Sequence, residues 1–325
     1  MMKLSKIIFS IFLVSLLSYH TAFAEKKVKT AKKRNSTKVP KKATYHASVP
    51  KPTLSNIAYG THPKHVLDFW KAESEKPTPL VFVIHGGGWK GGSKERLDRF
   101  ADAKKLLEAE ISVIAINYRL MAHTKGVVPP VKAPLTDAAR ALQFVRSKAK
   151  EWNVDSNRIG AAGGSAGGCS SLWLAYHDEM ADPKSEDPIA RYSTRLTCVA
   201  AQGPQTTLDP KQMKEWTPNS NYGGHAFGKK NFAEFLADRE KILPWIKKYS
   251  PYSLVSKDDP SVCMFYSRAP EIGKEQKDPT HTANFGLKLK EHCESLGLEC
   301  ILIYSQLKDK KYNTPTEYLI DVLKK

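Results

Sequence analysis

Short, almost wholly apolar runs recur along the chain from about residue 79 and alternate with segments of helical periodicity. Continuous apolar runs of this length are expected of strands that are buried on both faces of a sheet. Their alternation with helices predicts an α/β domain, with a mostly parallel sheet that helices cover on both faces. The predicted strands lie at 79–84, 111–118, 196–201, 262–266 and 300–304.

Helical periodicity is clearest between residues 138 and 152, where apolar residues recur at intervals of three and four. The same spacing returns between residues 285 and 296. Residues 205–256 lack the alternation of a strand and include a helix-like stretch, so we interpret them as a cap-like insertion. Further helices are predicted at 94–108, 232–249 and 317–325, and a first hairpin at 56–60 and 66–70.

The first 24 residues have the pattern of a secretory signal peptide. Lys3 and Lys6 precede an apolar run at 7–17, and the small residues Ala22 and Ala24 provide a cleavage pattern. The apolar run is too short for a membrane span of about 20 residues. We therefore predict an exported protein, periplasmic or extracellular, without a stable membrane span after cleavage.

Residues 25–51 are strongly basic and poor in large apolar side chains. They contribute nine of the chain's eighteen net positive charges. Such a segment cannot bury enough surface to offset the entropy of ordering it, so we predict a disordered linker. A basic tail can bind nucleic acid or an anionic envelope. In an exported chain we interpret it as a solvated spacer, expect no nucleic-acid partner, and predict one domain over residues 52–325.

The chain has five cysteines, and an odd number in an exported protein implies at least one unpaired thiol. Cys293 and Cys300 flank a predicted helix–strand joint and are the candidate pair, with their geometry open. Cys169 is expected to be a small buried hydrophobe. No cysteine or histidine cluster suggests a metal site, and no cofactor is expected.

Gly163-Gly164-Ser165-Ala166-Gly167 follows a predicted strand and precedes a helix of small residues. The pattern G-x-S-x-G is typical of a nucleophile elbow, a sharp turn that exposes the serine hydroxyl. A serine is a poor nucleophile until a base takes its proton and donors stabilise the oxyanion that forms. We predict Ser165 as the nucleophile and the backbone N–H of Ala166 as one oxyanion donor.

His85-Gly86-Gly87-Gly88-Trp89 follows the strand at 79–84 and has the HGGG pattern of an oxyanion loop. Gly87 and Gly88, which lack side chains, can present their N–H groups to the same point as Ala166. His85 is expected to hold the shape of the loop rather than to act as a base. Trp89 either lines a substrate pocket or packs in the core.

With these motifs and the lead-in Asp155-Ser156-Asn157-Arg158-Ile159, residues 56–325 resemble α/β-hydrolases of the hormone-sensitive-lipase and feruloyl-esterase-like (BD-FAE-like) group. The resemblance is to exported bacterial members among carbohydrate esterases in particular. It implies an α/β-hydrolase fold with an eight-stranded sheet and ester hydrolysis without a cofactor. It also implies a Ser-Asp-His triad in that chain order.

The resemblance places the acid after the strand that ends near residue 266, where Asp278 fits best. Glu271 and Glu275 are weaker candidates, and Asp209 would serve only if the acid had moved to the preceding strand. An aspartate before a proline is also a common turn residue. Asp137 and Asp155 are expected at helix starts or turns, as caps.

The resemblance places the histidine after the last strand, but no histidine follows residue 304. Tyr312 is a candidate for that position, although a neutral phenol with a pKa of about 10 is a poor base at neutral pH. His281, three residues after Asp278, is the first candidate for a relocated base. His225, in the predicted insertion, is the second.

The leading hypothesis is a serine carboxylic ester hydrolase that acts on an acyl ester. The substrate class, an acetyl or feruloyl ester of a polysaccharide or a small molecule, follows from the resemblance alone. One alternative is a catalytically impaired hydrolase fold that binds a glycan or envelope component. Another is a serine peptidase of the same fold. The oligomeric state is left open.

Overall fold

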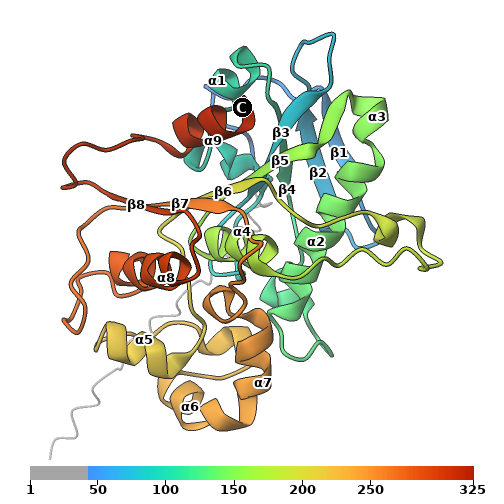
Figure 1. The fold of residues 1–325 in the computed structure, drawn as a ribbon. Helices are drawn as coiled ribbons and strands as arrows, with labels where there is room; N and C mark the ends of the chain where they lie inside the picture. Colours follow the sequence, from blue (N-terminus) through green and yellow to red (C-terminus); the bar gives the residue numbers. More distant parts are fainter. Residues whose placement is uncertain (1–42) are drawn as a thin grey trace, which may run out of the picture. The chain divides into compact units, whose positions relative to one another are not determined.

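The computed structural model describes residues 43–325. The predicted signal peptide and residues 25–42 of the predicted linker lie outside the described residues. The described part is built on a single eight-stranded sheet with the strand order β1-β2-β4-β3-β5-β6-β7-β8 (Figure 1). The strands are β1 (Leu54–Ala58), β2 (Val66–Trp70), β3 (Thr78–Ile84), β4 (Ser112–Ile116), β5 (Val154–Gly164), β6 (Cys198–Gln202), β7 (Ser261–Tyr266) and β8 (Cys300–Tyr304).

The sheet is mostly parallel, as the sequence predicts. β2 pairs antiparallel with β1 and with β4, and the five remaining pairings are parallel. Every residue of β3 is buried. The side chains of β3 alternate between two cores, with Leu80 and Phe82 in one and Val81 and Val83 in the other. This two-sided burial is the physical reason for the continuous apolar runs.

Helices cover both faces of the sheet, and Figure 1 shows α1 and α9 on one side and α2, α4 and α8 on the other. The α-helices are α1 (Ala103–Glu108), α2 (Lys132–Ser147), α3 (Ala149–Trp152), α4 (Ala166–Tyr176), α5 (Pro210–Trp216), α6 (Phe232–Ala237), α7 (Arg239–Tyr249), α8 (Ala283–Ser295) and α9 (Pro315–Leu323). The 3-10 helices are η1 (Lys94–Arg99), η2 (Met121–His123), η3 (Pro188–Arg191), η4 (Gly224–Phe227) and η5 (Pro251–Ser253).

The helix predicted at 94–108 is two shorter helices, η1 and α1. The Asp102 carboxylate accepts a hydrogen bond from the Lys105 N–H and so starts α1 as a new helix. Phe100, between the two helices, packs towards the end of β5, where a Cβ on Gly164 would lie 2.5 Å from the Phe100 ring. The periodicity of 94–108 did not reveal this break because both pieces keep one apolar side.

The segment between β6 and β7, where we expected the insertion at 205–256, contains α5, η4, α6, α7 and η5. Figure 1 shows α5, α6 and α7 grouped together at one end of the molecule. The helix predicted at 232–249 is interrupted at Asp238, where α6 ends and α7 begins. Asp209 caps α5 and Asn231 caps α6, each by accepting a backbone N–H.

The domain begins before residue 52, and the predicted linker is wrong for its last nine residues. The Tyr45 hydroxyl donates to Asp68 at 2.7 Å, and the Tyr45 ring packs edge-on against Trp70. The Trp70 indole N–H in turn donates to the Pro50 carbonyl at 2.7 Å. A single aromatic side chain with a buried partner thus orders a stretch whose composition alone predicted disorder.

Asp137 and the cysteine pair differ from the sequence-based predictions. Asp137 is not a cap: it is buried inside α2 and accepts hydrogen bonds from the guanidinium and the backbone N–H of Arg119. Asp155 does form a turn, accepting the Asn157 N–H at 2.9 Å. All five cysteines are buried free thiols, so Cys293 and Cys300 are not bridged. Within residues 43–325 no helix is long and apolar enough to cross a bilayer.

Candidate active site

Ser165 stands at the junction of β5 and α4 in a strained backbone conformation, with φ 52° and ψ −124°. Positive φ costs a non-glycine residue of the order of 1 kcal/mol or more and is seen where a tight turn requires it. The turn is tight because α4 starts directly beneath the end of β3. A Cβ on Gly167 would lie only 2.1 Å from the Ile84 carbonyl oxygen. The glycines around Ser165 therefore allow the sharp turn that the motif predicts.

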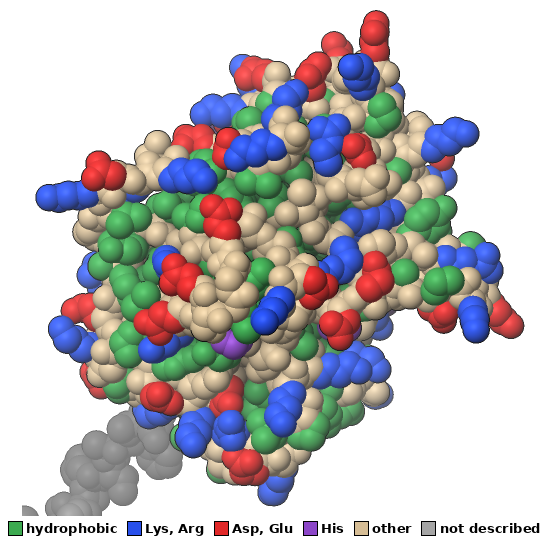
Figure 2. Space-filling view, viewed as in Figure 1, with side chains coloured by type: hydrophobic (Ala, Val, Ile, Leu, Met, Phe, Trp, Pro, Cys, Tyr) green, Lys and Arg blue, Asp and Glu red, His purple; other side chains and the backbone are tan. Residues whose placement is uncertain are grey.

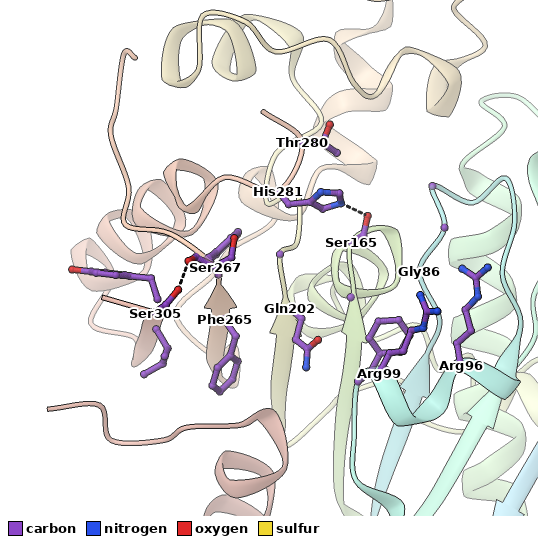
Figure 3. A pocket seen from close by; sticks show the side chains of 18 of the residues that line it. Gly86, Arg96, Arg99, Ser165, Gln202, Phe265, Ser267, Thr280, His281 and Ser305 are labelled. Atoms are coloured by element: carbon purple, nitrogen blue, oxygen red, sulfur yellow. Dashed lines mark hydrogen bonds between the residues drawn. The ribbon is translucent and has the colours of Figure 1, made fainter. Parts of the chain in front are cut away.

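His281 faces Ser165, with 3.0 Å between the histidine Nε2 and the serine Oγ (Figure 3). On the other side of the ring, His281 Nδ1 lies 2.8 Å from Asp278 Oδ2. Because a carboxylate only accepts hydrogen bonds, Nδ1 carries the proton and Nε2 is left to accept the serine proton. The structure thus joins Ser165, His281 and Asp278 in one hydrogen-bonded chain.

Asp278 and His281 come from the same loop between β7 and α8. Asp278 Oδ1 also accepts the backbone N–H groups of Thr280 and His281, both at 3.2 Å. The Gln205 amide donates to the Thr280 carbonyl at 2.6 Å and ties the loop to the segment after β6. A local turn around one carboxylate therefore sets the direction of the histidine ring.

The charge of Asp278 is favoured by this arrangement. Partial burial raises the pKa of the carboxyl, but the hydrogen bonds from His281 and from the Thr280 N–H outweigh it, so that the pKa lies below its usual value. The side chains of Asp278 and His281 are 62% and 41% exposed. The pair lies at the open edge of the site, unlike the buried acid of many triads.

The glycine loop after β3 lies opposite, with Gly87 at φ 114° and Gly88 at φ 62°. A Cβ on Gly87 would lie 2.3 Å from the Gly91 carbonyl oxygen, so no larger residue fits there. Within residues 43–325 the N–H groups of Gly87 and Gly88 donate to no backbone acceptor. Gly87, Gly88 and Ser165 line the same cleft, and Ala166 opens the helix that begins at Ser165.

His85 is buried and supports the loop, as the sequence led us to expect. Its Nδ1 donates to the Gly86 carbonyl at 2.9 Å, and its ring stacks on Tyr118. Burial lowers its pKa to about 4, because the charged ring would lose its water. Trp89 packs rather than lines the cleft: it is buried, and its indole N–H donates to Ser170 Oγ at 3.0 Å.

His225, the second candidate base, contacts the glycine loop after β3 instead of the serine. Its Nε2 donates to the Gly88 carbonyl at 2.9 Å. Burial, together with the nearby Lys90 charge, lowers its pKa to about 4. The insertion thus supplies a neutral histidine that holds Gly88 in place.

We expect His85 and His225, whose pKa values are both lowered, to make the fold sensitive to acid. Below pH 6.5 the unfolded chain protonates both rings, whereas the folded chain keeps them neutral down to about pH 4. Stability is therefore lost as the pH falls between these values. His225→Gln keeps an N–H donor that does not titrate. Between pH 7 and 4.5 the free energy of unfolding of this variant should therefore fall by about 2 kcal/mol less than that of wild type.

Urea denaturation at the two pH values measures this difference. His46→Gln, at an exposed position, provides the matched control and should follow wild type. Equal acid losses in wild type and His225→Gln would show that His225 does not carry the effect.

The other candidates are engaged elsewhere. The Tyr312 hydroxyl donates to Asp321 on α9 at 2.5 Å, and its ring is buried beneath that helix. Asp209 pairs with Arg239 at 2.6 Å. Glu271 pairs with Lys274 at 3.2 Å. Neither these residues nor Glu275 lines the cleft.

A cleft of about 840 Å³ opens over Ser165, His281 and the glycine loop. Sequence reasoning missed several of its lining residues, because they lie far apart along the chain and carry no motif. The buried Tyr222 hydroxyl has no hydrogen-bond partner within residues 43–325, and a Cβ on Gly88 would lie 3.5 Å from it. An unpartnered donor in a cleft calls for a polar ligand or water. The missed residues include Arg96, Arg99, Phe100, Tyr222, Phe265 and Lys310.

This geometry agrees with the protein-family comparison, in which the BD-FAE model matches residues 67–277. The chain belongs to the BD-FAE family. The match includes the glycine loop and Ser165 and ends one residue before Asp278. The loop that carries Asp278 and His281 therefore lies just outside the matched region.

The curated relatives resemble only part of the chain. Carboxylesterase NlhH of Mycobacterium tuberculosis is 34% identical over 107 residues, which are 33% of this chain and 32% of the relative. A putative alpha/beta hydrolase of Acanthamoeba polyphaga mimivirus is 30% identical over 156 residues, 44% of this chain and 43% of the relative. The chain thus spans only 32% and 43% of the length of these two relatives.

Solved structures share the fold over most of the described residues. A truncated carbohydrate esterase from gut microbiota is 19% identical with a TM-score of 0.60, over 80% of this chain and 90% of that one. An acetyl ester-xyloside bifunctional hydrolase from Caldicellulosiruptor lactoaceticus is 24% identical with a TM-score of 0.55, over 74% and 77%. At this level of identity the likeness establishes the α/β-hydrolase fold.

Proposed function

We propose that this BD-FAE-family protein is a serine carboxylic ester hydrolase. One observation supports it above all: the contact of 3.0 Å between Ser165 Oγ and His281 Nε2, with Asp278 behind the ring. Nucleophile, base and orienting acid within hydrogen-bond reach are what acyl transfer requires. The names of the curated relatives, which include a carboxylesterase, agree with this chemistry.

In this mechanism Ser165 Oγ attacks the ester carbonyl carbon while its proton passes to His281 Nε2. The carbonyl π-electron pair moves to the oxygen and forms a tetrahedral oxyanion. Collapse of this intermediate expels the alkoxide, which takes the proton from His281 and leaves as the alcohol. A water then attacks the acyl-serine by the same route and releases the acid. Asp278 keeps the tautomer of His281 correct and stabilises the imidazolium.

The oxyanion is held by backbone N–H groups of Gly87, Gly88 and Ala166. Such donors act at full strength in the transition state because the fold has already positioned them. The hydrogen bond from His225 to the Gly88 carbonyl helps to fix the loop. Ala166 lies at the start of α4, where the helix dipole also favours negative charge.

The acyl group that we propose is acetyl or feruloyl, on a small molecule or a polysaccharide, handled by an exported enzyme. Two proteins of similar fold, a carbohydrate esterase and an acetyl ester-xyloside bifunctional hydrolase, motivate this substrate class. The impaired-hydrolase alternative rested on the histidine missing after the last strand and on the basic tail. The contact of His281 with Ser165 favours an intact base over that alternative, and no observation favours the peptidase alternative.

A labelling experiment on the full chain tests the proposal. We expect p-nitrophenyl acetate to be hydrolysed and a fluorophosphonate to add to one residue, with mass spectrometry of peptides locating the adduct on Ser165. Loss of turnover in parallel with labelling would tie the activity to this residue. Labelling of a different serine, or turnover that persists in the fully labelled protein, would contradict the proposal.

A further inference from the structure

The cleft over Ser165 is basic. Arg96 and Arg99 of η1 and Lys310 of the β8–α9 loop line it, and no aspartate or glutamate is among its lining residues. Figure 3 shows the two arginine side chains next to each other on the Gly86 side of Ser165, across from His281. Several positive charges at one mouth raise the local concentration of anionic ligands.

The three cations are not neutralised within residues 43–325. None of them makes a salt bridge there, although many other basic side chains in the same range do. On the face seen in Figure 2, basic and acidic side chains are interspersed. The acid nearest to Arg96 in sequence, Glu95, pairs with Lys94 at 3.1 Å. The cleft thus differs from the surface in having cations without carboxylates.

The position of the arginines follows from the packing of η1 against the elbow. Phe100, which follows η1, fills the space that a side chain on Gly164 would need. This contact fixes the end of η1 beside Ser165. Arg96 and Arg99 lie three residues apart in η1 and are both exposed. Their guanidinium groups are therefore free to bind a ligand that also reaches Ser165.

We propose that this cleft binds an ester whose acyl or alcohol part carries a carboxylate, held by Arg96 and Arg99. The guanidinium group is the side chain best suited to a carboxylate, because its parallel N–H groups match the two oxygens. Lys310, in the loop between β8 and α9, adds a third positive charge to the cleft. The inference rests on the proposed ester hydrolysis and specifies its substrate class as anionic, such as an acylated uronic acid or a half-ester of a dicarboxylic acid.

Two pairs of esters separate the two positions of the carboxylate. For the alcohol part, 4-carboxyphenyl acetate is compared with neutral 4-carbamoylphenyl acetate. For the acyl part, 4-nitrophenyl hydrogen succinate is compared with neutral 4-nitrophenyl succinamate. For each pair we compare kcat/KM of the anionic ester with kcat/KM of the neutral ester, using the full chain. In one of the two pairs, this ratio should be roughly tenfold or more lower in Arg96→Gln/Arg99→Gln than in wild type. The pair that responds identifies the part that carries the charge.

The matched control removes two charges elsewhere. Lys125→Gln/Lys257→Gln changes exposed lysines that do not line the cleft and should keep the wild-type ratio. Higher salt should lower the ratio in wild type and less so in the arginine variant. A ratio that is the same in wild type and arginine variant for both pairs overturns the inference.

A binding measurement keeps this test separate from the proposed activity. Absence of turnover of every ester by the wild-type chain would count against ester hydrolysis. Titration calorimetry with 4-acetamidobenzoate, succinamate and their neutral amides then measures the affinity of the cleft for each anion and its amide. Tighter binding of an anion than of its amide, lost in Arg96→Gln/Arg99→Gln, supports the anionic cleft. Equal binding of each anion and its amide overturns it.

Discussion

Ser165→Ala is expected to lower kcat/KM for p-nitrophenyl acetate by at least roughly 10⁴-fold. The substitution removes the hydroxyl that we propose forms the acyl-enzyme, while the N–H donors of the glycine loop and the cleft remain. The residual rate would come from those donors acting on a water molecule. The alanine takes the same positive φ as the serine at similar cost, so the fold should be retained.

Steady-state kinetics and a thermal melt measure the two effects together. Ser295→Ala, at an exposed position outside the cleft, is the matched control and should match wild type in both. A Ser165→Ala protein that keeps a wild-type melt and more than a tenth of the activity would exclude Ser165 as the nucleophile.

His281→Ala should lower kcat/KM for the same ester by a factor within about tenfold of the Ser165→Ala effect. The two residues act as one unit, because the hydroxyl attacks only when its proton has an acceptor. The double variant should therefore be no worse than either single one. Added imidazole should restore part of the rate of His281→Ala and none of the rate of Ser165→Ala.

Asp278→Asn should have a smaller effect, roughly 10- to 100-fold on kcat. The carboxylate is largely exposed, so water screens its charge and replaces part of its hydrogen bonding.

For the His281→Ala variant, His46→Gln at an exposed position is the matched control. If His281→Ala retained most of the activity, the base would have to be another group, and the hydrogen bond to Ser165 would be only structural.

Much of the fold could be predicted from the pattern of apolar residues. The apolar run at 79–84 lies in β3, whose seven residues are all buried because both faces of this strand are covered. Breaks within a periodic segment could not be predicted in this way. The end of η1 and the start of α1 depend on the cap at Asp102 and on the packing of Phe100, and neither changes the period.

The boundary at residue 52 was wrong for a related reason. Composition measures how much surface a segment can bury on average, not whether one side chain has a partner. Tyr45 contacts Asp68 and Trp70, which lie more than twenty residues further along the chain. The role of Asp137 was likewise not predictable from its local sequence, because its partner Arg119 lies outside its helix.

The sequence by itself determined the α/β class, the elbow at Ser165 and the glycine loop at 85–89, because each depends on local backbone geometry or on burial periodicity. It left the general base open between His281, His225 and no histidine at all. Only the tertiary structure shows where each histidine lies: the β7–α8 loop brings His281 to Ser165, and the insertion brings His225 to Gly88. Contacts across 116 and 137 residues depend on how the loops are packed over the sheet, and no local pattern encodes them.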